Sequence, residues 1–599
     1  MSSSTIRSAA PATTKYTLET ARAPQQKKAP VWVGLKKLAP LFEGERRHVV
    51  LALTALTITS GTNLAAPLLI GHTIDRYIQM RDAAGLLRSS LIVMAVYLVG
   101  VAASYWQIRT MGAVGRRLLW RLRNQLFLKL QELPLAFFNA NKAGDLISRI
   151  NNDTDKLNQF IAQALMQFVG SMFLLTGTGL FIIGLNFRLG IASLLPAAAV
   201  ILLTRLIGPW MRSKNLQSLQ SLGGMSAEVQ EGLNNFKVIV AFHRHDYFRK
   251  KFHAANEKNF AASVKAGLAN GLLMPLYTLA SNLAQLAVLC YGIYLISAGL
   301  TTVGLLVGFL IYVNNFYGPL RQIAVMWSSF QLALAAFDRV SEVLALESDL
   351  PVIPAGPAEG DAVLAFRNVH FGYRTGQDVL HDVSFELERG KAYALVGPTG
   401  GGKTTTASLM ARLYDPVAGS VLLSGRDIRS YAPEERTRKI GFILQEPFLF
   451  TGTVRDNILY GNARYSNYTD QQLAEVLAEA NLEKLLSRFP QGLETKVATS
   501  GNSISLGQKQ IIAFMRAVLS EPELLILDEA TANIDTVTEQ LLEEILAKLP
   551  ARTTKVIIAH RLNTISNVDQ IFFVNSGEVM LAGSMEHAVD MLLHGKRAS

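Results

Sequence analysis

The stretch Gly397-Pro398-Thr399-Gly400-Gly401-Gly402-Lys403-Thr404 matches the phosphate-binding pattern G-x-x-x-x-G-K-[ST] at every position. The apolar run Ala392–Val396 before it predicts a strand, and a helix is expected to begin at Thr404. Glycines let backbone N–H groups approach phosphates, and a helix N-terminus adds positive potential there. The stretch therefore predicts a strand–loop–helix unit that binds a nucleotide, with Lys403 on the β- and γ-phosphates and Thr404 on Mg²⁺.

An acidic pair follows a second apolar run further along the chain. Leu524–Leu527 predicts a buried strand, and Asp528 and Glu529 come directly after it. Asp528 is suited to holding Mg²⁺, and Glu529 to orienting and polarising an attacking water. The alternative is that the pair is only the solvated end of a strand. Beside a phosphate-binding loop, the pair favours nucleotide hydrolysis.

The region around these motifs alternates short apolar runs with amphipathic helical patterns. The predicted strands are Ala392–Val396, Ile440–Leu444, Leu524–Leu527 and Lys555–Ala559. This alternation predicts an α/β domain with a largely parallel sheet. The Pro/Gly/Ala-rich stretch Asp349–Gly360 precedes the domain and is typical of a linker.

The first half of the chain is much more apolar. Half of all residues are hydrophobic and 17% are charged, whereas soluble proteins contain about a quarter charged residues. Neither the interval between Lys156 and Arg188 nor that between Lys265 and Arg321 contains Asp, Glu, Lys or Arg. Since about 20 apolar residues cross a bilayer as a helix, six spans are predicted, at 48–71, 89–110, 158–185, 189–208, 267–297 and 301–325.

The net charge of +12 would also suit a nucleic-acid partner, but the basic residues gather beside the predicted spans. Such residues mark the cytoplasmic side. The polar segments 111–157 and 209–266 and both termini are therefore predicted to be cytoplasmic, with long helical stalks, and nucleic acid is not an expected partner. The single cysteine, Cys290, excludes an intrachain disulfide. Residues 1–30 are expected to be disordered and lack the apolar run of a signal peptide.

Membrane spans combined with these two motifs resemble the ATP-binding cassette (ABC) transporters, over about residues 31 to 590. The resemblance implies the exporter-type (type IV) fold: an all-α six-helix transmembrane domain with long stalks, fused to an α/β P-loop nucleotide-binding domain. The implied boundaries are 31–345 for the transmembrane domain, 346–361 for a linker and 362–594 for the ABC ATPase domain. The implied cofactors are ATP and Mg²⁺.

Further positions match functional motifs of that family. Tyr373 corresponds to the aromatic residue that stacks on adenine, the alternative being a tyrosine that only packs on a strand. Gln445 corresponds to the glutamine that senses Mg²⁺, and His560 to the switch histidine near the γ-phosphate. The residues implied to bind ATP are Tyr373, Gly397, Pro398, Thr399, Gly400, Gly401, Gly402, Lys403, Thr404 and Thr405. Those implied to be catalytic are Glu529, His560 and Gln445, and those implied to hold Mg²⁺ are Thr404, Gln445 and Asp528.

The signature motif of the family departs from its usual Leu-Ser-Gly-Gly-Gln. Here it reads Ile504-Ser505-Leu506-Gly507-Gln508, so the first and third positions differ. Ser505, Gly507 and Gln508 are kept, and the first two can donate to a phosphate from a helix N-terminus. In this family the signature completes the ATP site of the other subunit, so its departures bear on that other site.

Two cytoplasmic segments resemble the loops that couple exporter-type membrane domains to their ATPase domains. The first contains Phe137-Phe138-Asn139, then Gly144–Arg149 and Asp153, with Asn139 where Asp is more usual. A short helix there would dock on the ATPase domain. The second runs from Glu231 to Phe242. The alternative for both is an ordinary charged helix face.

The resemblance implies ATP-driven export or flipping of a small amphipathic or hydrophobic substrate (drug, lipid or peptide) across a bacterial inner membrane. The protein would be half of a dimer. Heterodimerisation with a half-transporter whose catalytic residues are weakened is favoured over homodimerisation, because the signature is off-pattern beside an intact Glu529. Two alternatives remain: an importer built on the exporter fold, and a nucleotide-gated regulatory or channel-like protein. Polar residues of the last two spans either line a substrate path or hold helices together: Tyr277, Asn282, Gln285, Asn314, Asn315, Tyr317 and Trp327.

Overall fold

The computed structural model describes residues 16–18, 36–348, 350–374, 376–498, 504–528, 535–558, 568–583, 586–587 and 590–591. The chain divides into two compact units, each of which is described by itself. The membrane unit comprises Ala21–Leu128 and Ile147–Leu344. The ATPase unit comprises Met1–Thr20, Lys129–Leu146 and Ala345–Ser599, so it includes the first predicted coupling segment as far as Leu146.

Six helical segments among the described residues are long and apolar enough to cross a membrane. They are Arg46–Ile78, Ala83–Glu132, Ala143–Leu185, Phe187–Asn234, His245–Ser297 and Val303–Ile323, which confirms the six-span prediction. Several continue well past a bilayer. Helix α4 (Ala83–Glu132) has 50 residues and is therefore roughly 75 Å long, against about 30 Å of hydrocarbon. Stalks beyond the spans follow from these lengths.

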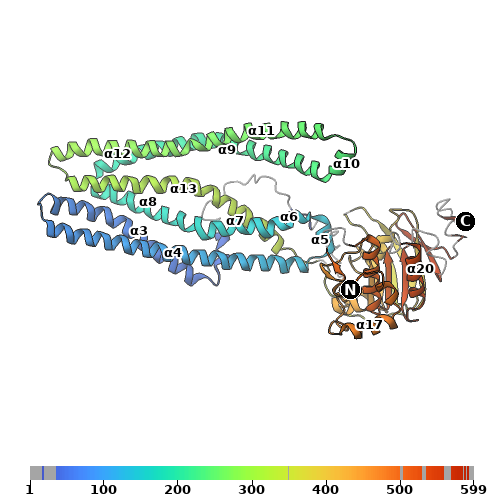
Figure 1. The fold of residues 1–599 in the computed structure, drawn as a ribbon. Coiled ribbons are helices and arrows are strands. Elements are labelled where there is room, and N and C mark those ends of the chain that lie inside the picture. Colours follow the sequence, from blue (N-terminus) through green and yellow to red (C-terminus); the bar gives the residue numbers. More distant parts are fainter. Residues whose placement is uncertain are drawn as a thin grey trace, which may run out of the picture. The chain divides into compact units, whose positions relative to one another are not determined.

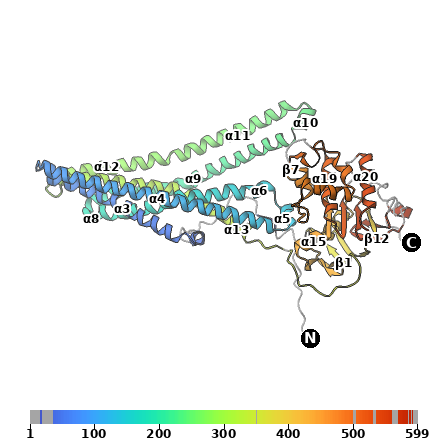
Figure 2. The same ribbon diagram turned by 60° about the horizontal axis from the view of Figure 1, so that its bottom comes forward.

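Short breaks and π-helical turns divide some of these long segments into shorter helices. Their bounds are α3 (Arg46–Thr73), α7 (Thr154–Gln159), α8 (Leu165–Leu185), α9 (Phe187–Asn234), α10 (Phe236–Ala241), α11 (His245–Gly271), α12 (Leu273–Ser297) and α13 (Val303–Leu344). Single π-helical turns join some of them: η2 (Ile74–Ile78), η3 (Arg149–Asp153) and η4 (Phe160–Ala164). Helices α9 and α11 run side by side (Figure 1), and α10 joins their far ends (Figure 2).

Small residues and interhelical hydrogen bonds hold this bundle together, as is usual where lipid removes the hydrophobic drive between helices. A Cβ on Gly304 of α13 would lie 2.1 Å from the backbone oxygen of Gly71 in α3. Near the same point, Asp75 Oδ1 accepts a 2.7 Å bond from the Gly304 N–H. Only a glycine at position 304 allows this approach of α3 to α13.

The polar residues of the last two spans mostly bind neighbouring helices. Tyr317 donates to the Ser193 carbonyl at 2.8 Å, and Gln285 donates to Asn314 Oδ1 at 2.9 Å. Asn315 donates to the Asn63 carbonyl at 3.3 Å, and the Tyr277 and Thr204 hydroxyls lie 3.4 Å apart. Asn282 is exposed. Helix attachment is therefore one role of these residues, and a substrate path along them stays a prediction. The side chain of Trp327 lies outside the described residues.

The ATPase domain has two main sheets. A six-stranded sheet has the order β12-β11-β3-β10-β9-β6, and all its pairings are parallel except β11 with β12. Its strands are β3 (Ala392–Val396), β6 (Ile440–Ile443), β9 (Leu524–Asp528), β10 (Thr554–Ile558), β11 (Gln570–Asn575) and β12 (Glu578–Leu581). The four predicted strands are confirmed within the described residues, each to within a residue or two at its ends.

The second sheet is antiparallel, with the order β2-β1-β4-β5, and the sequence patterns did not predict it. Its strands are β1 (Leu364–Phe371), β2 (Leu380–Leu387), β4 (Ala418–Leu423) and β5 (Arg426–Asp427). Helices α16 (Val454–Ile458), α17 (Asp470–Glu479), α18 (Glu483–Leu486) and α19 (Leu506–Leu519) share one apolar core with β6 and β9. The other helices are α14 (Lys403–Met410), α15 (Pro433–Lys439) and α20 (Thr536–Ala547).

Residues 16–18 depart from the disorder predicted for residues 1–30. Tyr16 is fully buried, and Asn141 bonds to the backbone of both Tyr16 and Leu18. The expectation of disorder rested on average composition. A single aromatic ring with a matching pocket anchors a short polar segment that composition does not distinguish from its neighbours.

Candidate active site

The glycine-rich loop lies between β3 and α14, as its sequence predicts. Gly402 is the residue before α14, and the helix begins at Lys403, one residue earlier than expected. Gly397 and Gly402 have φ values of 147° and 115°, which favour glycine. A Cβ on Gly397 would lie 2.0 Å from the Val574 backbone oxygen in β11. The loop therefore needs glycine for both its conformation and its close contact with β11.

Lys403 lies across the loop. Its Nζ donates to the carbonyls of Gly397 at 2.8 Å and Pro398 at 3.0 Å, and its side chain is buried. Thr405 is also buried, whereas Thr404 is exposed at the first turn of α14. Thr404 is therefore open to solvent at the N-terminus of α14, where anions are favoured, while the Lys403 ammonium group is held by the loop.

The strands that lead to the predicted Mg²⁺ ligands Thr404, Asp528 and Gln445 all end at the same edge of the six-stranded sheet. Strand β10 pairs with both β3 and β9, and Ile558 is in register with Asp528. Because neighbouring strands are about 4.8 Å apart, the carboxyl ends of β3 and β9 lie about 10 Å apart. Gln445 follows the end of β6, the strand beside β9, and is exposed. Such an edge is where open α/β sheets bind ligands.

The donor set at this edge fits Mg²⁺. It offers the Thr404 hydroxyl, the Asp528 carboxylate and the Gln445 amide, and oxygen ligands are those that Mg²⁺ prefers. Asp528 is 2% exposed, which suits a carboxylate held close to a cation. Glu529 and His560, the predicted base and switch residues, lie outside the described residues.

Tyr373 belongs to an aromatic cluster beside the loop. Its ring stands edge-on to Phe371 and Tyr414, with centroids 4.9 and 5.2 Å away. Its hydroxyl lies 3.2 Å from that of Thr405, so Tyr373 is tied to α14. Tyr373 is half-buried. This exposure fits a residue that stacks on adenine as well as one that only packs on a strand.

Tyr414 was not predicted as a functional residue, since nothing in a single sequence marks it. It is buried, and burial raises the pKa of its hydroxyl, which is therefore protonated at neutral pH. Asn139 Nδ2, on α5 (Leu135–Ala140), donates to Tyr414 Oη at 2.6 Å. The short helix predicted in the first coupling segment is thus present and bonds to the ATPase domain of its own unit.

The signature residues lie at the start of α19. Ser505 precedes the helix, and its hydroxyl accepts from the Gln508 N–H at 3.2 Å while Gln508 Oε1 accepts from the Ser505 N–H at 3.0 Å. This reciprocal cap fixes the helix N-terminus. The two departures differ: Ile504 is buried in the helical core, whereas Leu506 is 42% exposed.

Comparison with known proteins assigns the family. Residues 49–320 match the model of the ABC transporter transmembrane region, and residues 380–532 match the ABC transporter model. A fatty acid ABC transporter ATP-binding/permease protein of Mycobacterium bovis is 32% identical over 524 residues, which are 88% of this chain and 82% of that protein. The chain belongs to the ABC transporter family.

Other relatives support the exporter type of this transporter. A multidrug resistance ABC transporter ATP-binding and permease protein of Lactococcus lactis subsp. cremoris is 32% identical over 501 residues, 83% of each chain. The structure of a bacterial Atm1-family ABC exporter with ATP bound aligns with a TM-score of 0.75 and 27% identity, covering 92% of this chain and 99% of that one. The chain is therefore an ATP-hydrolysing, multi-pass membrane transporter of the exporter type with a cytoplasmic ATPase domain.

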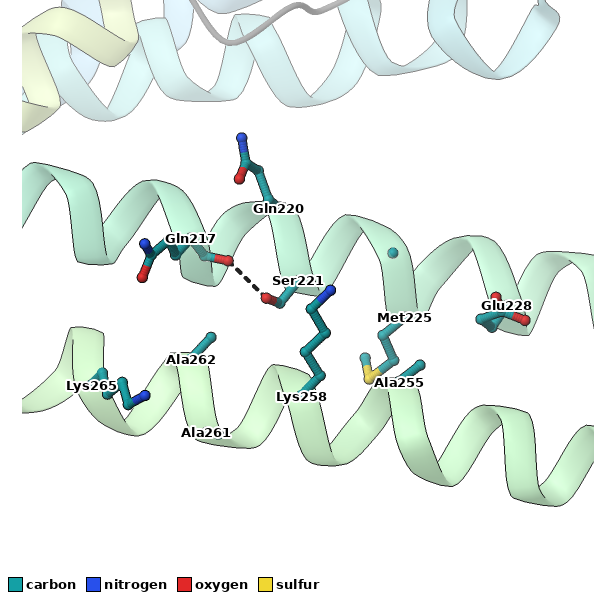
Figure 3. A pocket seen from close by; sticks show the side chains of 11 residues that line it. Gln217, Gln220, Ser221, Met225, Glu228, Ala255, Lys258, Ala261, Ala262 and Lys265 are labelled. Atoms are coloured by element: carbon teal, nitrogen blue, oxygen red, sulfur yellow. Dashed lines mark hydrogen bonds between the residues drawn. The ribbon is translucent and has the colours of Figure 1, made fainter.

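The transporter also has a cavity of about 560 Å³ between the stalk parts of α9 and α11. Figure 3 shows Lys258 and Met225 reaching between the two helices, and the Ser221 hydroxyl bonded to the Gln217 carbonyl at 2.8 Å. Small residues such as Gly224 and Ala261 line the rest. The cavity lies past the apolar spans.

The described residues contain no group of three His, Cys, Asp or Glu side chains that could hold a metal ion.

Two substitutions distinguish the readings of Tyr373. If its ring stacks on adenine, Tyr373→Ala should raise the KM for ATP roughly 5- to 150-fold, since one base–aromatic stack contributes about 1–3 kcal/mol. Tyr373→Phe keeps the ring and loses the Thr405 contact, so its KM should stay within about threefold of wild type. A steady-state ATPase titration of the purified protein measures both. An alanine variant that lowers Tm but leaves KM unchanged would favour packing alone.

Proposed function

We propose that the protein is one half of a dimeric exporter that uses ATP to move an amphipathic or hydrophobic substrate across the membrane. One observation carries this. The phosphate-binding loop, at the carboxyl ends of the parallel strands, and the signature, at the start of α19, lie on the same ATPase domain. This domain follows six apolar spans in the sequence. The domain boundaries proposed are 31–345, 346–361 and 362–594.

Within the chain's own ATP site, each predicted residue has a proposed role. Lys403 and the loop N–H groups bind the phosphates, and Tyr373 stacks on adenine. Thr404, Asp528 and Gln445 hold Mg²⁺, which when bound neutralises charge that develops on the phosphates. Glu529 orients and activates the attacking water, and His560 contacts the γ-phosphate. The carboxyl-edge placement of Asp528 and Gln445 supports this assignment.

A second subunit completes the function. In the proposed dimer, Ser505 and Gly507 face the phosphates held by the partner's loop, with the Ser505 hydroxyl and the Gly507 N–H as donors at the capped N-terminus of α19. The tip of the α9–α11 pair supports dimerisation as well. Helix α10 leaves Phe236, Val238 and Phe242 more than half exposed, and an apolar group at a cytoplasmic tip favours a protein partner.

Leu506 supports the heterodimer over the homodimer. An exposed leucine takes the place of glycine where a phosphate would approach the helix N-terminus. This weakens the site that the signature serves, while the residues of the chain's own loop match the family pattern. A partner with weakened catalytic residues would carry the weakened site. The homodimer, with two identical sites of this kind, is the second candidate.

The proposed substrate is amphipathic or hydrophobic. No Asp, Glu, Lys or Arg lies between Lys265 and Arg321, and several polar groups there bind other helices. A charged substrate would therefore find no opposite charge along the interval 266–320 of this chain. The names of two relatives, a fatty acid transporter and a multidrug resistance transporter, are in line with this class.

Transport direction tests export against import and against a channel-like role. Inside-out vesicles containing the protein should accumulate a fluorescent long-chain fatty acid or a lipophilic dye when ATP and Mg²⁺ are added outside. Accumulation should stop with vanadate or with Lys403→Ala, the matched control. ATP-dependent uptake confined to right-side-out vesicles with ATP inside would indicate import. Flux that needs ATP binding but resists vanadate would indicate a nucleotide-gated channel.

The two departures of the signature should have different effects where the signature serves a competent site. Leu506→Gly removes an exposed side chain from the N–H groups of α19. In the homodimer, where the signature serves a competent site, it should raise ATP hydrolysis at least about threefold, and in the heterodimer, where the partner's catalytic residues are weakened, it should leave the rate unchanged. Ile504→Leu is a volume-conserving change in the core and should leave the rate within about 1.5-fold. The rate is measured on the purified dimer. In the homodimer, equal effects of the two variants, or none from Leu506→Gly, would show that the departures do not limit hydrolysis.

A further inference from the structure

The described segment Tyr16–Leu18 lies against the coupling helix α5, although more than a hundred residues separate them in the sequence. Tyr16 is 0% exposed and Leu18 5%. The Tyr16 ring meets Phe137 of α5 edge-on, with centroids 6.4 Å apart. Edge-to-face aromatic pairs of this kind stabilise the packing of the elements that carry them. The segment is therefore an anchored part of the ATPase unit.

One asparagine binds the segment and α5 together. Asn141, directly after α5, donates through Nδ2 to the carbonyls of Tyr16 and Phe137, both at 2.8 Å. Its Oδ1 accepts from the Leu18 N–H at 3.1 Å. At the other end of the ring, Tyr16 Oη donates to the Glu347 carbonyl at 3.0 Å. The segment is thus bonded both to the end of α5 and to the residues that precede the ATPase domain.

Helix α5 depends on such contacts. It has six residues, and helices shorter than about 12–15 residues are marginal in water without tertiary packing. On its ATPase side, Asn139 donates to Tyr414. Tyr414 in turn stands edge-on to Tyr373, whose hydroxyl meets Thr405. A chain of contacts therefore connects α5 to the aromatic residues beside the phosphate-binding loop.

We propose that Tyr16–Leu18 is a positioning segment for α5, with Tyr16 and Asn141 as its positioning residues. The segment holds α5 where Asn139 reaches Tyr414, and so holds Tyr414 against Tyr373. The proposal rests on the proposed function only in this last step, through the role of Tyr373. The attachment of the segment to α5 is independent of any nucleotide.

Hydrogen exchange on the full-length protein tests the attachment. Two matched deletions are compared, 2–12, which leaves the segment in place, and 2–18, which removes it. Deletion of 2–18 and Tyr16→Ala should each speed exchange over residues 133–142 about tenfold, because a buried ring and several hydrogen bonds are lost. Deletion of 2–12 should have no effect, and α14 should exchange as in wild type in every variant. Tyr16→Phe, which keeps the ring and loses the bond to Glu347, should give a smaller increase of about threefold or less.

Kinetics test the connection to the ATP site. Deletion of 2–18 and Tyr16→Ala should raise the KM for ATP about threefold and leave kcat within about twofold, since a loosened Tyr373 weakens binding rather than the chemical step. Exchange over residues 133–142 within twofold of wild type after deletion of 2–18 would overturn the proposal. Faster exchange with an unchanged KM would overturn its step to Tyr373. A wild-type protein without ATPase activity would instead contradict the proposed function and leave the exchange comparison valid.

Discussion

The ATP site depends on a close backbone approach between the glycine loop and β11. A Cβ on Gly397 or Gly401 would lie 2.0 or 2.6 Å from the Val574 oxygen, so no side chain fits at either position. This contact seats the loop on the sheet and lets its carbonyls hold Lys403. Because Asp528 and Gln445 follow strands of the same sheet, the constraint that seats the loop also places it relative to them.

The membrane unit also depends on a close backbone approach that only glycine allows. Glycine at position 304 lets α13 approach α3, and hydrogen bonds between spans join several polar groups of the last two helices. Polar groups in hydrocarbon need partners, and these bonds supply partners for the groups that make them.

The sequence predicted those parts that local patterns determine. Uncharged intervals gave the spans, and apolar runs gave the strands of the parallel sheet, because both depend on neighbouring residues. Contacts between distant positions had no such signal. The Asn139–Tyr414 bond joins residues 275 positions apart, and the burial of Tyr16 needs Phe137 and Asn141. Comparison with the family motif identifies the two departures in the signature from sequence alone. The structure was needed to show that Ile504 is a core residue whereas Leu506 is exposed.

The central claim is that the edge of the sheet that ends in Asp528 is a hydrolytic ATP site. Glu529, the next residue after β9, lies outside the described residues. Because it is the proposed base that activates the attacking water, a substitution of Glu529 tests this claim most directly. Glu529→Gln keeps shape and hydrogen bonding but removes the charge that activates water. The purified variant should bind ATP with wild-type affinity and hydrolyse it at least about 100-fold more slowly. Hydrolysis at the wild-type rate would contradict the account.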